Sequence, residues 1–351
     1  MNAIPKHQVR PLRIGLIGAG WVTQHHLAGW RQHASRARVV SIADPNTEQA
    51  QARASVFGID QVFASAEQML AQGDLDAVDV AAPRETHAEL VRLAAQRGLP
   101  VLCQKPLAPT YEEACALVAE TRDHTRLMVH ENWRFRPYYR QISRWLHEQR
   151  IGPVVQVHMS LLTSGLIADA QGRYATLDRQ PFMATLQRAL VMEVLIHHID
   201  TLRFLLGDLR LVHARLGQGC TAMAGEDRAS IIFESASGAT VCLLSNLRVW
   251  GEPEAKPDEL LLIGERGCIR LSGDTLRCQG DQPEQHTYDL PACYTESYAA
   301  TIGHFMDALG DGRPFETSPQ DNLQTLRLVE DIYSFGSCSG LGLIRQPEGG
   351  R

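Results

Sequence analysis

Between residues 12 and 130, short apolar runs alternate with longer segments whose apolar residues recur at helical spacing. The apolar runs are rich in Val, Ile and Leu and barely alternate with polar residues, as strands buried on both faces do. They occupy residues 13–18, 39–43, 77–82, 100–103 and 127–129, and helical segments between them include 47–57, 85–97 and 111–122. Repeated strand–helix–strand units of this kind predict a doubly wound α/β domain with a parallel sheet.

After about residue 150 the pattern changes, because residues 154–162 alternate between apolar and polar side chains. Such alternation is typical of an antiparallel strand with one face in water. Further strands are expected at 229–233, 240–244, 259–264, 268–271 and 275–279, and helices at 138–149, 190–206, 297–308 and 323–334. The aperiodic polar segment 164–181 is expected to form a loop over the functional site.

These patterns predict two domains in an α/β protein. The first is a Rossmann dinucleotide-binding domain over residues 1–130, and the second is an α+β domain with a mostly antiparallel open sheet over residues 131–351. A chain of 351 residues usually exceeds one hydrophobic core, which agrees with this division.

The composition argues against several classes of protein. With 34 Lys and Arg against 40 Asp and Glu, the net charge is −6, which disfavours nucleic acid as the main partner. Residues 1–13 lack the apolar core of a signal peptide, and no uninterrupted apolar run is long enough to span a bilayer. We therefore expect a cytoplasmic protein whose partners include neither nucleic acid nor a membrane.

The eight cysteines form no CxxC pair and no Cys/His cluster with the spacing of a zinc site. Most of them lie in apolar stretches, so they are interpreted as buried, reduced thiols. Two pairs of adjacent histidines, His25–His26 and His197–His198, have no third ligand spaced nearby. No metal is therefore expected.

A glycine-containing turn follows the first predicted strand and opens the first predicted helix. Gly18 would allow the tight turn, and Gly20 would let the backbone approach a pyrophosphate resting on the helix amides that follow Trp21 and Val22. Thr23 stands where a third glycine is usual. The alternative is a turn with a structural purpose only.

Asp44 ends the second apolar run, at the distance where a carboxylate accepts a hydrogen bond from a ribose 2′-hydroxyl. A carboxylate there would repel a 2′-phosphate, and no Arg follows directly to bind one. The sequence therefore favours NAD over NADP as the cofactor. The alternative is that Asp44 caps a helix or a turn.

Four further segments have a recognisable order along the chain. They are Ala-Pro-Arg-Glu-Thr-His at 82–87, Gln-Lys-Pro at 104–106, Asn-Trp-Arg-Phe-Arg-Pro at 132–137, and Glu193 with His197 and Asp200. Together with the Gly18–Gly20 turn and Asp44, they resemble the glucose–fructose oxidoreductase, inositol dehydrogenase and MocA (Gfo/Idh/MocA) family over residues 12–208. Two positions depart from the family pattern: Gln104 replaces a Glu and Glu193 replaces an Asp.

The resemblance implies that Lys105 contacts substrate and nicotinamide, that His197 exchanges the substrate proton, and that Glu193 assists. By the same resemblance, cofactor-binding residues include Pro83, His87 and Gln104, and substrate-binding residues include Asn132 and Arg134.

The residues themselves fit these roles. Lys105 lies at the carboxyl end of a predicted parallel strand, where open α/β sheets bind ligands. Glu193 and His197 are four residues apart and would share one face of an α-helix, and histidine suits proton transfer near neutral pH. The alternatives are a surface lysine before a loop proline and a buried structural histidine.

The leading hypothesis is an NAD-dependent oxidoreductase that transfers hydride between a sugar or polyol and the nicotinamide. The reaction would take an aldose to a lactone or a secondary alcohol to a ketone. The alternatives are a glycoside hydrolase that uses bound NAD, and a catalytically silent sugar or dinucleotide sensor of the same fold. By family analogy and from its open sheet, the chain is expected to form a homodimer or homotetramer.

Overall fold

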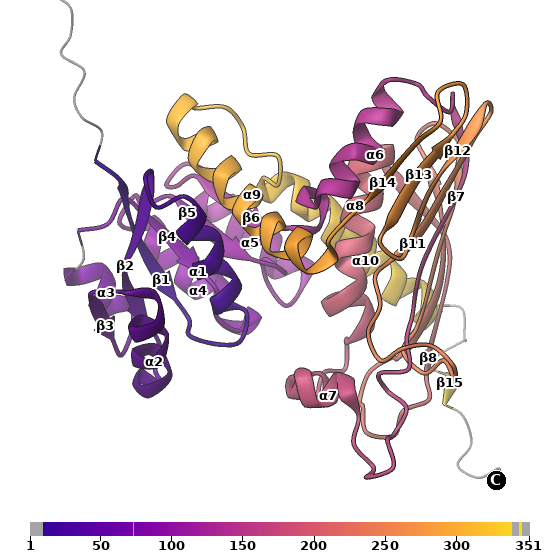
Figure 1. The fold of residues 1–351 in the computed structure, drawn as a ribbon. Coiled ribbons are helices and arrows are strands. Elements are labelled where there is room, and N and C mark those ends of the chain that lie inside the picture. Colours follow the sequence, from indigo (N-terminus) through magenta and orange to yellow (C-terminus); the bar gives the residue numbers. More distant parts are fainter. Residues whose placement is uncertain (1–9, 73, 339–343, 346–351) are drawn as a thin grey trace, which may run out of the picture. The chain divides into compact units, whose positions relative to one another are not determined.

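The computed structural model describes residues 10–72, 74–338 and 344–345, and the chain divides into two compact units (Figure 1). Unit 1 contains Met1–Phe135 and Tyr294–Leu323, and unit 2 contains Arg136–Cys293 and Gln324–Arg351. The chain therefore enters unit 1 twice, whereas the sequence pattern suggested the contiguous ranges 1–130 and 131–351.

Unit 1 is built on a parallel sheet of six strands in the order β3-β2-β1-β4-β5-β6. The strands are β1 (Leu12–Ile17), β2 (Ala37–Ala43), β3 (Gln61–Phe63), β4 (Ala77–Val80), β5 (Val101–Gln104) and β6 (Leu127–His130). Every residue of β4, β5 and β6 is buried, as expected for strands covered on both faces. The predicted doubly wound sheet is confirmed.

The helices of unit 1 are α1 (Thr23–Gln32), α2 (Thr47–Phe57), α3 (Ala66–Gln72), α4 (Arg84–Ala95), α5 (Tyr111–Thr121) and α9 (Leu290–Asp311). Helix α9 joins this unit because its apolar residues Ile302 and Phe305 enter the same buried cluster as Trp30 of α1. A Cβ atom at Gly29 would lie 2.8 Å from Cδ1 of Ile302, so the glycine permits the close approach of α1 to α9.

Unit 2 contains a sheet of nine strands in the order β14-β13-β12-β11-β7-β10-β9-β8-β15. The strands are β7 (Val154–Leu162), β8 (Leu209–Gln218), β9 (Arg228–Ser235), β10 (Thr240–Asn246), β11 (Glu259–Gly264), β12 (Gly267–Ser272), β13 (Thr275–Gln279), β14 (Glu284–Thr287) and β15 (Ile344–Arg345). Among the described strands of this sheet, only the pairs β7–β10 and β8–β15 are parallel. The predicted, mostly antiparallel sheet is confirmed.

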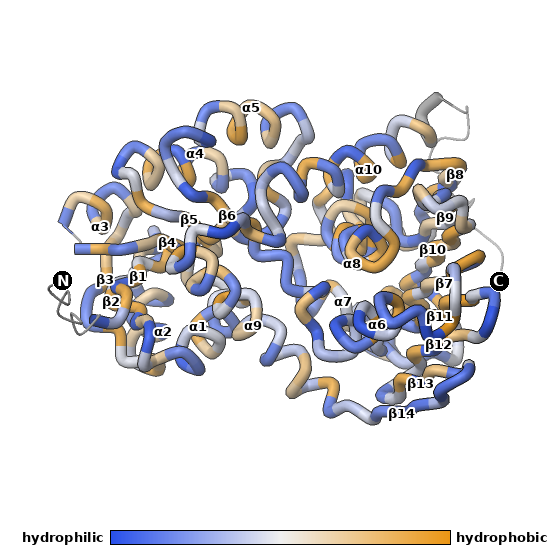
Figure 2. The backbone as a smooth tube through the Cα atoms, turned by 90° about the horizontal axis from the view of Figure 1, so that it is seen from above, coloured by the Kyte–Doolittle hydropathy of each residue, from blue (hydrophilic) through white to orange (hydrophobic). Residues whose placement is uncertain are grey.

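Helices cover one face of this sheet. They include α6 (Pro137–His147), α8 (Ile196–Leu206) and α10 (Pro319–Cys338), and Figure 1 shows them on the same side. Seven consecutive residues of α8 are buried, and α8 is largely orange in Figure 2. The other face of the sheet carries half-exposed side chains such as Leu244, which is 44% exposed.

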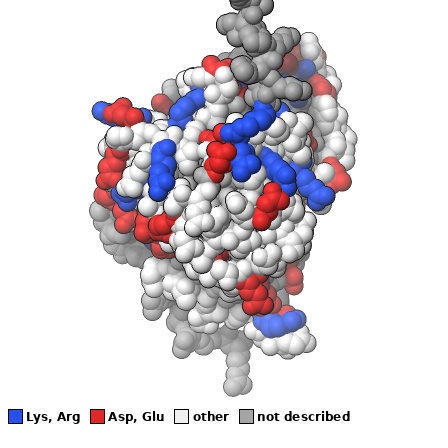
Figure 3. Space-filling model, turned by 90° about the vertical axis from the view of Figure 1, so that its left-hand side faces the viewer, with Lys and Arg blue, Asp and Glu red and all other residues white. Residues whose placement is uncertain are grey.

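Two observations bear on partners. Among the described residues, no helix is both long and apolar enough to cross a membrane. On the face drawn in Figure 3, basic and acidic side chains are interspersed. That face therefore carries no field of a single sign of the kind that nucleic acid requires.

Candidate active site

The turn after β1 is held where the carboxyl ends of three strands meet. Gly18 has a φ of 107°, and its N–H donates to the Ala43 carbonyl at the end of β2 (2.8 Å). A Cβ atom at Gly18 would lie 2.4 Å from the Ala81 carbonyl oxygen, just beyond β4. The buried Thr23 hydroxyl donates to the Gly18 carbonyl (3.2 Å), so the residue in place of a third glycine fastens the turn.

Gly20 differs from Gly18 in that a side chain at this position would meet open space. A Cβ atom at Gly20 would have no neighbour within 4 Å. The N-cap residue of α1, Val22, makes no side-chain cap, whereas Asn46 caps α2 and Thr110 caps α5. No Val22 side-chain cap therefore competes with an anion such as a pyrophosphate at the start of α1, and the residues present fit a dinucleotide.

The two glycines provide a matched pair of variants. We expect Gly18→Ala to lower the free energy of unfolding by more than about 1 kcal/mol, because the new Cβ meets backbone and the φ is positive. We expect Gly20→Ala to keep the melting temperature and to raise the Kd for NAD at least about tenfold. Thermal unfolding and NAD titration of both variants measure this. Unchanged NAD affinity in Gly20→Ala would show that the dinucleotide does not bind at this turn.

Asp44 supports the same turn. Its carboxylate accepts from the Ala19 N–H (2.7 Å) and from the Asn46 N–H (2.8 Å). A carboxylate has room for about four hydrogen bonds, so these two contacts leave capacity for a ribose hydroxyl. Arg53 of α2 also reaches the turn, where its guanidinium lies 3.3 Å from the Gly20 carbonyl oxygen. The sequence analysis missed Arg53, because the contact depends on how α2 packs.

Lys105 follows β5, at the same edge of the sheet as the glycine turn. Its backbone N–H donates to the side-chain oxygen of Gln104 (2.7 Å), and its peptide bond to Pro106 is cis. The buried ring of His87 lies between two carbonyl oxygens, 2.7 Å from that of Pro106 and 2.9 Å from that of Ala82. His87 therefore links the Lys105 turn to the segment that contains Pro83, the N-cap residue of α4.

Two predicted substrate-binding residues make contacts inside unit 1. The Asn132 side-chain amide donates to the Ser297 hydroxyl on α9 (2.8 Å). Arg134, in a short 3-10 helix (Trp133–Phe135), forms a largely buried ion pair with Asp321 (2.8 Å). The motif containing them thus fastens residues 294–323 to the parallel sheet, and their part in substrate binding stays a prediction.

The two adjacent histidines of α8 differ in their surroundings. His198 is fully buried, and its Nε2 lies 2.8 Å from Asp258, whose other oxygen accepts from the Tyr139 hydroxyl (2.7 Å). His197 is 7% exposed. The pairing with Asp258 gives His198 a structural task and favours His197 as the histidine that acts on a substrate.

Glu193 lies in a π-helical segment (Leu190–Leu195) that runs directly into α8. The predicted helix over 190–206 is therefore present, but its first six residues are π-helical and only the rest is α-helical. The carboxylate of Glu226, 1% exposed, accepts from the Val191 N–H (2.9 Å) and from the Tyr333 hydroxyl. Burial raises the pKa of Glu226 above its ordinary value, although these hydrogen bonds oppose the shift. No periodic pattern around Glu226 indicated this role. Glu226 anchors the start of a π-helical segment, a type that often occurs at functional sites.

The structure thus gathers the predicted residues into two sets. Unit 1 carries the glycine turn, Asp44 and Lys105 at one edge of its sheet, next to the point where the strand order reverses between β1 and β4. Unit 2 carries Glu193 and His197 on consecutive helical segments. Among the described residues, no group of three or more His, Cys, Asp or Glu side chains is placed to hold a metal ion.

Both units match descriptions of one protein family. Residues 12–131 match the "Oxidoreductase family, NAD-binding Rossmann fold", and residues 139–270 match the "GFO/IDH/MocA C-terminal domain". These two matches cover more than half of the chain.

Individual proteins resemble the chain over most of its length. D-apiose dehydrogenase from Paraburkholderia graminis is 32% identical over 338 residues, covering 93% of this chain and 88% of that protein. Inositol 2-dehydrogenase from Rhizobium meliloti is 28% identical over 335 residues, covering 91% and 95%. An oxidoreductase from Agrobacterium radiobacter, crystallised with NAD+, L-tartaric acid and magnesium, is 27% identical with a TM-score of 0.86, covering 93% and 97%.

Proposed function

Because this chain belongs to the GFO/IDH/MocA family of NAD-binding oxidoreductases, we propose that its substrate is an aldose, which it oxidises at the anomeric carbon. The family and the similar dehydrogenases already show that the chain is an NAD-dependent oxidoreductase acting on a sugar or polyol. The observation that carries the finer proposal is the similarity to D-apiose dehydrogenases, 32% and 30% identical over 93% and 92% of the chain.

The chemistry of an aldose suits the proposed residues. In its ring form an aldose carries a hydroxyl on the anomeric carbon, and removing a hydride and a proton from that group gives a lactone. NAD, when bound, supplies the acceptor for the hydride. We propose that a ring nitrogen of His197 takes the hydroxyl proton, that the ammonium group of Lys105 polarises the hydroxyl oxygen, and that Glu193 favours the protonated imidazole.

The substrate proposal is tested by comparing kcat/KM for D-apiose, other aldoses and myo-inositol with NAD. We expect an aldose to exceed myo-inositol by at least about tenfold, or ~1.4 kcal/mol in transition-state binding. A preference for myo-inositol would contradict the proposal and favour oxidation of a secondary alcohol to a ketone. Release of free sugar from a glycoside without accumulating NADH would instead indicate the hydrolase alternative.

We also propose that NAD binds more tightly than NADP. The support is Asp44, whose negative charge at the edge of the glycine turn would repel a 2′-phosphate. Arg53 lies near the same turn, and its positive charge acts against this preference. Titration with both cofactors measures the difference, and markedly tighter NADP binding would contradict the assignment.

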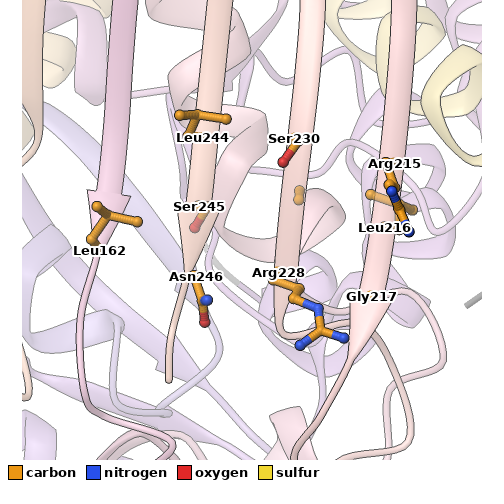
Figure 4. A pocket seen from close by; sticks show the side chains of 10 residues that line it. Leu162, Arg215, Leu216, Gly217, Arg228, Ser230, Leu244, Ser245 and Asn246 are labelled. Atoms are coloured by element: carbon orange, nitrogen blue, oxygen red, sulfur yellow. The ribbon is translucent and has the colours of Figure 1, made fainter. Parts of the chain in front are cut away.

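The open face of the unit 2 sheet supports a proposal about assembly: a homodimer or homotetramer in which a second copy covers this face. Two rows of side chains cross β7, β10, β9 and β8 there and line a shallow depression (Figure 4). The rows include Leu244 opposite Ser230, and Asn246 between Leu162 and Arg228. Sedimentation equilibrium would show a dimer or tetramer if the proposal holds, and a monomer at micromolar concentration if it does not.

We propose the cytoplasm as the location. All described cysteine side chains are free thiols, namely Cys103, Cys115, Cys220, Cys242, Cys268, Cys278 and Cys293; the side chain of Cys338 lies outside the described part. Burial raises the pKa of the Cys103 thiol well above its ordinary value, so it stays protonated and unreactive. Fractionation of the source cells tests the location, and recovery outside the cytoplasm would contradict it.

A further inference from the structure

A buried chain of hydrogen bonds runs through unit 1 toward the backbone of Lys105. It begins at Asp79 in the middle of β4 and at His26 in α1, both with no exposed surface. The Asp79 carboxylate accepts from the Trp30 indole N–H (2.7 Å), and Nδ1 of His26 lies 2.9 Å and 3.0 Å from its two oxygens. Because an ionised carboxylate can only accept, Nδ1 of His26 carries a hydrogen and donates.

Gln104 continues the chain to the proposed catalytic lysine. Its side-chain oxygen accepts from the Lys105 N–H (2.7 Å), and its side-chain nitrogen lies 3.2 Å from Nε2 of His26. The backbone N–H can only donate, so this network assigns the amide oxygen to the Lys105 side and the amide nitrogen to the His26 side. The amide nitrogen can only donate in turn, so Nε2 of His26 must be the acceptor.

These constraints define one protonation state. The arrangement that satisfies every donor and acceptor has a hydrogen on Nδ1 of His26, beside the Asp79 carboxylate, and none on Nε2. With a hydrogen on Nε2, the His26 N–H would face the N–H group of the Gln104 amide, so two donors would meet. If the amide were rotated, its N–H group would instead face the Lys105 N–H. Either arrangement would bury unsatisfied polar groups, which is costly in the absence of water.

Neighbouring rings fix the orientation of His26. The His130 ring lies against it with centroids 4.2 Å apart and an interplanar angle of 33°, and the Tyr298 ring makes an edge contact at 5.4 Å. The titratable groups that face His26 are Asp79, His130, Tyr298 and the adjacent His25, whose pKa is lowered mainly by burial. Among these described neighbours, Asp79 is the one that is anionic.

We propose that Asp79, His26 and Gln104 are positioning residues that hold the backbone of Lys105, with Gln104 selecting the neutral Nδ1–H form of His26. The effect of these hydrogen bonds on turnover rests on the proposed function of Lys105. The position of the hydrogen on the His26 ring does not depend on that function. A carboxylate at position 104 would still accept from the Lys105 N–H. It would also place an acceptor opposite Nε2 of His26, so that His26 would have to take up a second hydrogen.

The form of His26 is tested in the full-length protein labelled with ¹⁵N-histidine. Long-range ¹H–¹⁵N spectra distinguish Nδ1–H, Nε2–H and doubly protonated rings, and backbone-directed experiments assign the His26 signals without a variant at that position. We expect an Nδ1–H ring in the wild type and a doubly protonated ring in Gln104→Glu at the same pH. A hydrogen on Nε2 in the wild type, or an unchanged ring in Gln104→Glu, would overturn the proposal.

The coupling to Lys105 is tested by kinetics. We expect Gln104→Leu, which removes the acceptor for the Lys105 N–H, to lower kcat about 10- to 100-fold. Gln104→Glu restores an acceptor and should recover part of that loss, which a variant that merely disturbed packing would not explain. Gln72→Leu, at the exposed end of α3, is the matched control and should leave kcat unchanged.

The outcomes separate this inference from the proposed function. If Lys105→Met keeps full activity, the proposed function of Lys105 fails, while the spectra still decide the form of His26. If Lys105→Met is inactive and Gln104→Leu keeps the wild-type kcat, the proposed function of Lys105 is supported. The proposal that Asp79, His26 and Gln104 position Lys105 is then wrong.

Discussion

Lys105→Met is expected to lower turnover by about 10²- to 10⁴-fold while NAD binding is retained. The ammonium group is the proposed contact with the reacting oxygen, and methionine keeps the apolar length of the side chain without its charge. The backbone N–H that Gln104 accepts is present in both proteins, so the turn should keep its shape. Stopped-flow turnover and NAD titration, measured on the same preparation, separate the two effects.

The chain offers a matched control for this variant. Lys256 also precedes a proline, and its ammonium group pairs with Glu252 (3.0 Å), a residue that is not part of the proposed site. Lys256→Met should therefore leave turnover unchanged. Undiminished turnover in Lys105→Met would show that the lysine takes no part in the reaction. If the variant lost NAD binding together with turnover, a disturbed turn would be the cause instead.

His197→Gln is expected to cost a similar factor in turnover, about 10²- to 10⁴-fold, with the melting temperature nearly retained. Glutamine fills a comparable volume but cannot take up a proton at neutral pH. His198→Gln should behave in the opposite way, because it leaves Asp258 without one of its buried partners and should cost roughly 3 kcal/mol of stability. The contrast tests which of two adjacent histidines acts in catalysis.

Turnover and thermal unfolding of both variants measure this contrast. His124→Gln, at an exposed position after α5, is the control for the loss of an imidazole elsewhere and should change neither quantity. If His198→Gln lost turnover without losing stability while His197→Gln stayed active, the choice of His197 over His198 as the catalytic histidine would be wrong.

Much of unit 1 could be predicted from the sequence, because its strands are buried on both faces and read as continuous apolar runs. The glycine turn could be placed for the same reason, since it follows such a run. Strand β3 (Gln61–Phe63) was missed because three partly exposed residues produce no periodicity. In unit 2, β8 (Leu209–Gln218) was missed because Arg and His interrupt its apolar residues.

Other features depend on tertiary packing. An amphipathic helix such as α9 shows that it has a buried face, but not which core that face joins. The π-helical start of the Glu193 segment depends on Glu226, more than thirty residues away along the chain. Asp79 did leave a signal in the sequence, a carboxylate inside an apolar run, because a buried charge must have partners. Those partners, His26 and Trp30, became identifiable only in the folded structure.

The central claim is that this chain oxidises a sugar by direct transfer of hydride to NAD. The most direct measurement uses D-apiose or another active aldose with deuterium in place of hydrogen on the anomeric carbon, followed by NMR of the recovered cofactor. We expect NADH that carries the deuterium at nicotinamide C4, formed by the wild type and at least about 100-fold more slowly by Lys105→Met. Binding of NAD and sugar without any deuterated NADH, across aldoses and polyols alike, would contradict it and leave a sensor of the same fold.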